Sequence, residues 1–146
     1  MKSFFLALQF LTRLSIRIDD VKPGEHPRAM MWFPLVGLVI GSLSFLVYFA
    51  CMLAGLPPEI SAGLLIVAMA LVTGGLHLDG LSDTADGFYA GRDKESVLRI
   101  MDDTHTGAMG VIAIVGVLVL KYGTLVAILR EVPAAELTVT LLVVPV

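Results

Sequence analysis

The sequence predicts an all-α protein, a multi-pass transmembrane helical bundle, on three observations. Hydrophobic residues make up 57% of the 146-residue chain and charged residues only 16%, too few to cover a water-exposed surface. Apolar segments reach the roughly 20 residues that one helical crossing of a bilayer requires. Three of them are complete, residues 33–54, 60–78 and 107–129, and a fourth starts near Ala134. Most of the basic residues, eight of ten, flank these segments on one side.

The first 18 residues, "MKSFFLALQFLTRLSIRI", predict an N-terminal amphipathic helix. Apolar residues recur there near helical spacing, and Lys2, Gln9 and Arg13 fall on another side. A signal peptide is excluded because no small-x-small cleavage site follows the apolar stretch, and arginines stand in its place. The pattern fits a helix that lies in the membrane lipid interface equally well as one that lines a cavity.

The distribution of basic residues predicts the orientation in the membrane. Residues 55–59, "GLPPE", form a tight Pro-Gly turn, so the first two crossings are expected to form an antiparallel hairpin. Eight of the ten basic residues then fall on one face, which the positive-inside rule makes cytoplasmic. They are Lys2, Arg13, Arg17, Lys22, Arg28, Arg92, Lys94 and Arg99.

The composition also limits the partners and the extent of the protein. The net charge is −3, and no basic run interleaved with aromatic residues indicates nucleic acid. Cys51 is the only cysteine, so a thiolate metal site cannot form within the chain. Since the chain stops inside an apolar segment, we expect residues 1–146 to be a single membrane-embedded domain belonging to a longer protein. The oligomeric state does not follow from the sequence.

Three aspartates follow the second apolar segment in the stretch "GGLHLDGLSDTADGFYAG", residues 74–91. At 100° per residue, Asp83 and Asp86 lie about 40° and about 20° to either side of Asp79, so the three share one helical face. Like charges at this spacing repel, and no Lys or Arg in the stretch offsets them. A bound divalent cation would offset this repulsion. Ligands that are all oxygen atoms favour Mg²⁺ or Mn²⁺. The alternative is a solvated acidic patch without function.

A second polar stretch, "RIMDDTHTGAMG" at residues 99–110, leads directly into the third apolar segment. Asp103 is a residue type that caps helix N-termini. Gly107 precedes a helix whose first amides can receive an anionic group. Capping does not account for the whole run of acids, hydroxyls and His105, which faces the same side of the membrane as the aspartates. An acidic metal cradle beside basic groups suits a diphosphate substrate.

Four stretches of the chain resemble, in the correct order, the signatures of the cobalamin synthase family, the adenosylcobinamide-GDP ribazoletransferases. They are "LQFLTRL" at 8–14, "FPLVGLVIG" at 33–41, "LHLDGLSDTADG" at 76–87 and "IMDDTHTGAMG" at 100–110. The resemblance covers essentially the whole chain but only the N-terminal part of the family's length. Two positions depart from the family: Ser15 stands where Pro is frequent, and His105 stands where Arg is frequent.

The resemblance implies an enzyme of the bacterial or archaeal cytoplasmic (inner) membrane with its active face in the cytoplasm. Its substrates would be a corrinoid nucleotide, adenosylcobinamide-GDP, and alpha-ribazole or its phosphate. The products would be adenosylcobalamin or its phosphate and GMP, with Mg²⁺ as the cofactor, in the last steps of cobalamin biosynthesis.

Phosphoryl transfer of this kind depends mainly on positioning and charge neutralisation. We therefore expect the three aspartates, Asp79, Asp83 and Asp86, to be catalytic as ligands of one or two Mg²⁺ ions. Asp103 would be a further ligand or the general base. The candidate phosphate-binding residues are Arg13, Arg92, Arg99, His105 and Gly107, and each arginine is also explained as a positive-inside anchor.

The residues alone leave two alternative functions open. Another membrane transferase acting on a diphosphate, of the CDP-alcohol phosphotransferase or prenyltransferase type, would use similar acids. The D-G-x-x-A-R signature of the former is not matched, because Asp83 and Thr84 stand at its last two positions. An ion-coupled transporter would also carry membrane carboxylates, but near the bilayer midplane and on discontinuous helices, whereas these acids cluster at one end.

Overall fold

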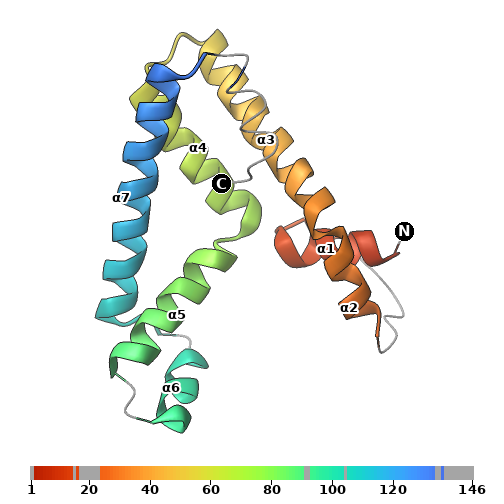
Figure 1. Cartoon of the computed structure of the whole chain (residues 1–146), viewed down its shortest axis with the longest axis vertical. Coiled ribbons are helices and arrows are strands. Elements are labelled where there is room, and N and C mark those ends of the chain that lie inside the picture. Colours follow the sequence, from red (N-terminus) through yellow and green to blue (C-terminus); the bar gives the residue numbers. More distant parts are fainter. Residues whose placement is uncertain are drawn as a thin grey trace. The chain divides into compact units, whose positions relative to one another are not determined.

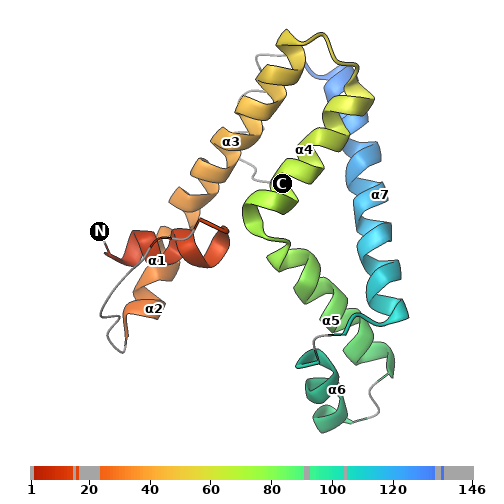
Figure 2. The same cartoon turned by 180° about the vertical axis from the view of Figure 1, so that it is seen from behind.

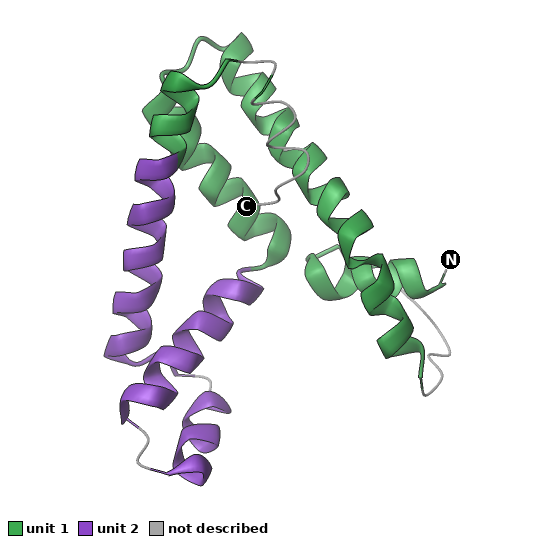
Figure 3. Ribbon diagram, viewed as in Figure 1, with its two compact units in different colours: residues 1–74, 125–146 green, residues 75–124 purple. Residues whose placement is uncertain are grey.

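A computed structural model of the chain describes residues 2–14, 16, 24–90, 93–103, 105–133 and 136. All regular structure in these residues is helical, as the sequence predicts (Figures 1 and 2). The helices are α1 (Lys2–Leu11), α2 (Glu25–Ala29), the 3-10 helix η1 (Met30–Trp32), α3 (Phe33–Leu53), α4 (Pro58–Thr73), α5 (Leu76–Ala90), α6 (Lys94–Met101) and α7 (Ala108–Glu131). They form two compact units, residues 75–124 and the remainder (Figure 3).

The expected N-terminal helix is present as α1. Its Leu6, Ala7 and Leu8 are buried in a cluster with Val36 and Ile40 of α3. The aromatic ring of Phe4 also meets that of Trp32 edge-on, with centroids 5.8 Å apart. Contact with α3 therefore stabilises a ten-residue helix that would be marginal by itself in water.

Within the described residues, two helical stretches are long and apolar enough to cross a membrane, residues 25–53 and α7. The second crossing, expected at 60–78, is not one continuous helix. α4 ends at Thr73 because Gly74 adopts the left-handed conformation, with φ of 68°, that ends many helices. A third span exists only if α4 and α5 are counted together as one broken span. The expected fourth segment lies outside the described residues, apart from Glu136.

The turn between α3 and α4 has the hairpin character that "GLPPE" predicts. Gly55 takes a positive φ of 64°, and Pro57 and Pro58 lead into α4. At the same end of this unit Glu59, in the first turn of α4, forms an ion pair with Arg130 in the last turn of α7. Leu125 of α7 is buried against Ala62 and Leu65 of α4. The end of α7 thus lies beside the α3–α4 turn, as it must if both reach the same side of a membrane.

Residues 75–124 contain α5, α6 and most of α7. The short helix α6 begins with a capping box, in which the Asp93 carboxylate accepts from the Ser96 amide at 2.8 Å. The Asp93 amide donates to Ser96 Oγ at 3.1 Å in return. α6 packs closely on α5, because a Cβ placed on Gly87 would lie 2.9 Å from Met101 Cγ and 3.3 Å from Val97 Cγ1. This unit holds the aspartates that the sequence analysis singled out.

Candidate functional site

The three aspartates of the predicted row lie together on α5, so their helical spacing is confirmed. α5 starts afresh after the Gly74–Gly75 break, and the Asp79 amide donates to the Gly75 carbonyl at 2.8 Å. Asp79 is exposed, Asp83 is half-buried, and Asp86 is buried with 9% of its surface exposed. Exposure therefore decreases along the row, from Asp79 to Asp86.

Asp86 makes two hydrogen bonds to the start of α7. Its Oδ2 accepts from the Gly107 amide at 2.7 Å, and its Oδ1 accepts from the Gly110 amide at 2.8 Å. These amides, at Gly107 and Gly110, were expected to receive an anionic group of the substrate, with Gly107 as a phosphate-binding residue. In the structure they donate instead to the carboxylate of Asp86, and phosphate binding at Gly107 stays a prediction.

Two glycines leave the room that this contact needs. A Cβ on Gly107 would lie 2.7 Å from Asp86 Cγ. A Cβ on Gly110 would overlap the Asp86 carboxylate and Ser82 Oγ, and would lie 3.1 Å from the Ser82 carbonyl oxygen. The start of α7 thus approaches the backbone of α5 at Gly110, and a side chain at either position would have to displace the Asp86 carboxylate.

Ser82 is a site residue that the sequence analysis missed. It lies one helical turn before Asp86, is 2% exposed, and its Oγ has no hydrogen-bond partner in the described part of the chain. A buried hydroxyl without a partner is uncommon and costs free energy. The signal that could have found it is the i,i+4 spacing of Ser82 and Asp86, which places both side chains against α7.

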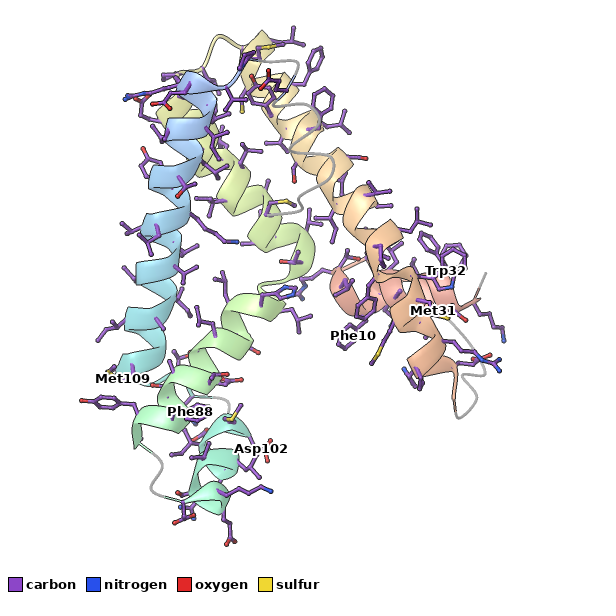
Figure 4. All side chains as sticks on the ribbon, in the orientation of Figure 1. Phe10, Met31, Trp32, Phe88, Asp102 and Met109 are labelled. Carbon is purple, nitrogen blue, oxygen red and sulfur yellow. The ribbon has the colours of Figure 1, made fainter. Side chains whose placement is uncertain are left out.

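Asp103 and His105 form a second polar pair. Asp103 Oδ1 lies 2.6 Å from His105 Nδ1 and also accepts from the His105 amide at 3.1 Å. The hydrogen bond to Asp103, and then its negative charge, raises the pKa of His105 above its ordinary value. Both side chains are largely exposed. The pair lies just before α7, and Asp102, labelled in Figure 4, is the C-cap residue of α6.

The predicted basic residues are placed only in part. Arg99 lies in the last turn of α6 and is exposed. Arg13 belongs to the other unit, where its amide donates to the Val72 carbonyl at 2.8 Å. Arg92 lies outside the described residues. The structure thus brings Asp86 to Gly107, and Asp103 to His105, and leaves the phosphate-binding role of the arginines as a prediction.

The donor set on α5 fits Mg²⁺ through two carboxylates. No three His, Cys, Asp or Glu side chains converge as a metal site anywhere in the described ranges. Each oxygen of Asp86 accepts a hydrogen bond from an amide, whereas Asp79 and Asp83, four residues apart, are more accessible. Mg²⁺ is commonly held by one or two carboxylates together with substrate phosphates and water. Asp79 and Asp83 meet that requirement.

The fold and the site define a helical protein with apolar helices long enough to span a membrane, whose acidic helix α5 is hydrogen-bonded through Asp86 to the start of α7. The chain belongs to the cobalamin-5-phosphate synthase family, whose sequence model matches residues 3–146. The resemblance of the four signature stretches is thereby confirmed. No solved structure matches the chain.

Several similar curated proteins are named adenosylcobinamide-GDP ribazoletransferase. One from Clostridioides difficile (strain 630) is 46% identical over 123 residues, which cover 84% of this chain and 48% of that protein. One from Pseudomonas fluorescens is 42% identical over 133 residues, covering 90% and 54%. One from Clostridium botulinum (strain Okra / Type B1) is 39% identical over 132 residues, covering 90% and 53%. The chain spans about half the length of these relatives.

Proposed function

We propose that this chain is the N-terminal, metal-binding part of an adenosylcobinamide-GDP ribazoletransferase. The reaction would transfer the adenosylcobinamide-phosphate group to alpha-ribazole or its phosphate, with GMP as the leaving group. One observation supports the proposal most strongly: family membership over residues 3–146, with the acidic signature folded as α5. Family membership also favours this reaction over the CDP-alcohol, prenyl and transporter alternatives.

The roles of the residues follow from the charge of the substrate. A diphosphate brings several negative charges to the site, and the Mg²⁺ that we assign to Asp79 and Asp83 would neutralise part of them. Arg99 and the protonated His105 would bind phosphate oxygens, because the raised pKa of His105 favours its charged form. We expect Asp103, whose Oδ1 is bonded to His105, to orient that ring or to accept a proton from the attacking hydroxyl.

We propose a location in the cytoplasmic membrane with the active face in the cytoplasm. The supporting observations are the apolar stretches 25–53 and α7 and the one-sided basic residues.

The test is a chimera in which residues 1–146 replace the matching half of the Clostridioides difficile relative. The purified chimera, in liposomes, is supplied with adenosylcobinamide-GDP, alpha-ribazole and Mg²⁺, and the release of GMP is measured. We expect GMP release that EDTA abolishes. Absence of GMP release from a folded chimera, under conditions in which the intact relative is active, would contradict the proposal.

A further inference from the structure

We propose that Asp86 is a positioning residue: its carboxylate supplies both acceptors of a capping box to α7 and thereby docks α7 on α5. In this role Asp86 does not bind the metal assigned to Asp79 and Asp83. The claim about the metal rests on the proposed function. The docking role rests on the geometry alone and is tested separately.

The hydrogen bonds of Asp86 match those of a capping box. In a capping box the N-cap side chain accepts from the N3 amide, and the N3 side chain accepts from the N-cap amide. α7 starts at Ala108, so Gly107 is its N-cap and Gly110 is its N3 residue. Neither glycine has a side chain to offer. Asp86 accepts from both amides, one with each oxygen. A single carboxylate from a neighbouring helix thus replaces both side chains of the motif.

The burial of Asp86 and its place at the start of α7 favour this role. The carboxylate is buried, and its negative charge lies at the positive end of the α7 dipole, where an anion is stabilised. If the side chain turned towards a metal, the Gly107 and Gly110 amides would lose their acceptors, and the Gly110 amide is itself buried. Among the described contacts of α5, neither Asp79 nor Asp83 accepts a hydrogen bond from the start of α7. The row of three is therefore divided into two candidate ligands and one structural anchor.

Docking has a consequence for the site. It holds the Asp103–His105 pair, which lies just before α7, at the end of α5 that carries Asp86. Asp83 lies less than one helical turn before Asp86 on α5. Loss of the Asp86 contact would therefore release the polar stretch before α7 from the acidic helix, without removing any group that reacts.

The first experiment perturbs the contact without changing an acid. In the full-length chimera, Gly110→Ala places a methyl group where the Asp86 carboxylate lies, and Gly116→Ala is the matched control on the same helix. No atom of the described residues comes within 4 Å of a Cβ on Gly116. We expect Gly110→Ala to lower the thermal midpoint in detergent, and Gly116→Ala to leave it unchanged or raise it, since Ala favours a helix over Gly. Equal midpoints for the two variants would overturn the docking role.

The second experiment moves the cap from one helix to the other. Asp86→Ala should reduce the hydrogen-exchange protection of the Gly110 amide by about tenfold, the loss of a typical cap. Asp86→Ala also opens the space beside Gly107, because the atoms nearest a Cβ there belong to Asp86. The double variant Asp86→Ala/Gly107→Ser should restore the protection, since Ser caps its own helix. A double variant as unprotected as Asp86→Ala would overturn the capping-box assignment.

The metal statement is tested with Mn²⁺ as the probe, by electron paramagnetic resonance on the same proteins. We expect Asp83→Asn to weaken Mn²⁺ binding by at least about tenfold and Asp86→Ala/Gly107→Ser to change it by less than about threefold. If the double variant loses as much affinity as Asp83→Asn, Asp86 is a ligand and the inference is wrong. If the unaltered protein binds no Mn²⁺, the metal assignment of the proposed function fails, and the docking role is decided by the midpoints and the exchange data.

Discussion

The side chain of Arg13 lies against Gly74, the residue that ends α4. A Cβ on Gly74 would lie 2.5 Å from Arg13 Cγ and 2.7 Å from Arg13 Cδ. Gly74 also has a φ of 68°, which side chains of L-residues rarely adopt. Glycine is therefore required at position 74 for two reasons, the positive φ and the close approach of the Arg13 side chain. Both local geometry and packing thus fix the break between α4 and α5 at this residue.

We predict that Gly74→Ala destabilises the protein more than Gly75→Ala. Both residues have a positive φ, so each substitution should cost roughly 1–2 kcal/mol for the left-handed backbone. Only Gly74→Ala must also displace Arg13, at about 1 kcal/mol for an unfavourable rotamer, because no atom in the described part of the chain lies within 4 Å of a Cβ on Gly75. The measurement is the free energy of unfolding in detergent. The excess should vanish in an Arg13→Ala background, and an excess that persists there would refute the contact.

Asp83→Asn should abolish most of the activity of the chimera. The substitution keeps the size of the side chain and removes one negative charge from the proposed metal site. Lost charge stabilisation of this kind costs on the order of 10² to 10³ in rate, about 3–4 kcal/mol. Release of GMP in liposomes is the measurement. The fold should survive, because removing a like charge from the row relieves repulsion with Asp79.

Glu95→Gln is the matched control for Asp83→Asn. Glu95 is an exposed acid in the first turn of α6, and its replacement changes the net charge by the same amount. We expect near-normal GMP release from this control. Near-normal release from Asp83→Asn as well would show that the aspartate row is an acidic patch without a catalytic role.

The orientation of the chain in the membrane predicts a labelling pattern. In a Cys51→Ser background, a cysteine at Lys94 should react with an impermeant maleimide only from the cytoplasmic side. A cysteine at Pro57 should react only from outside, because the α3–α4 turn lies at the other end of the hairpin. Labelling is measured on intact cells and on inverted vesicles. Reaction at position 94 in intact cells would contradict the orientation.

The sequence predicted what depends on local periodicity. The aspartate row is helical because its 3.6-residue spacing is a property of α5 alone, and the hairpin turn follows from Gly55 and the two prolines after it. The end of α4 at Thr73 was missed, although a Gly-Gly pair is a known signal for a helix C-terminus. Apolar residues on both sides of Gly74 concealed the break.

The capping of α7 by Asp86 could not be predicted from the sequence, for a different reason. The bonded residues are 21 and 24 positions apart, so no local pattern links them. A glycine at position 107 offers no side-chain cap to the helix that follows it, and from that an acceptor elsewhere could have been inferred. Which acid supplies it depends on how α5 and α7 pack, and that is a tertiary property.

The last prediction concerns pH and the capping box of α6. The hydrogen bond from the Ser96 amide is the main cause that lowers the pKa of Asp93 below its ordinary value of 3.8. A carboxyl group whose pKa is lower in the folded state stabilises that state above pH 3.8, and the contribution is lost as the pH falls through the folded-state pKa. The Ser96 amide resonance of labelled protein in micelles should therefore titrate with a midpoint below 3.8. Asp93→Asn should keep the amide protected and abolish the titration, because Asn also caps helices, whereas Asp93→Ala should lose both. A midpoint at or above the ordinary value would mean that the Asp93 carboxylate does not cap α6 in solution.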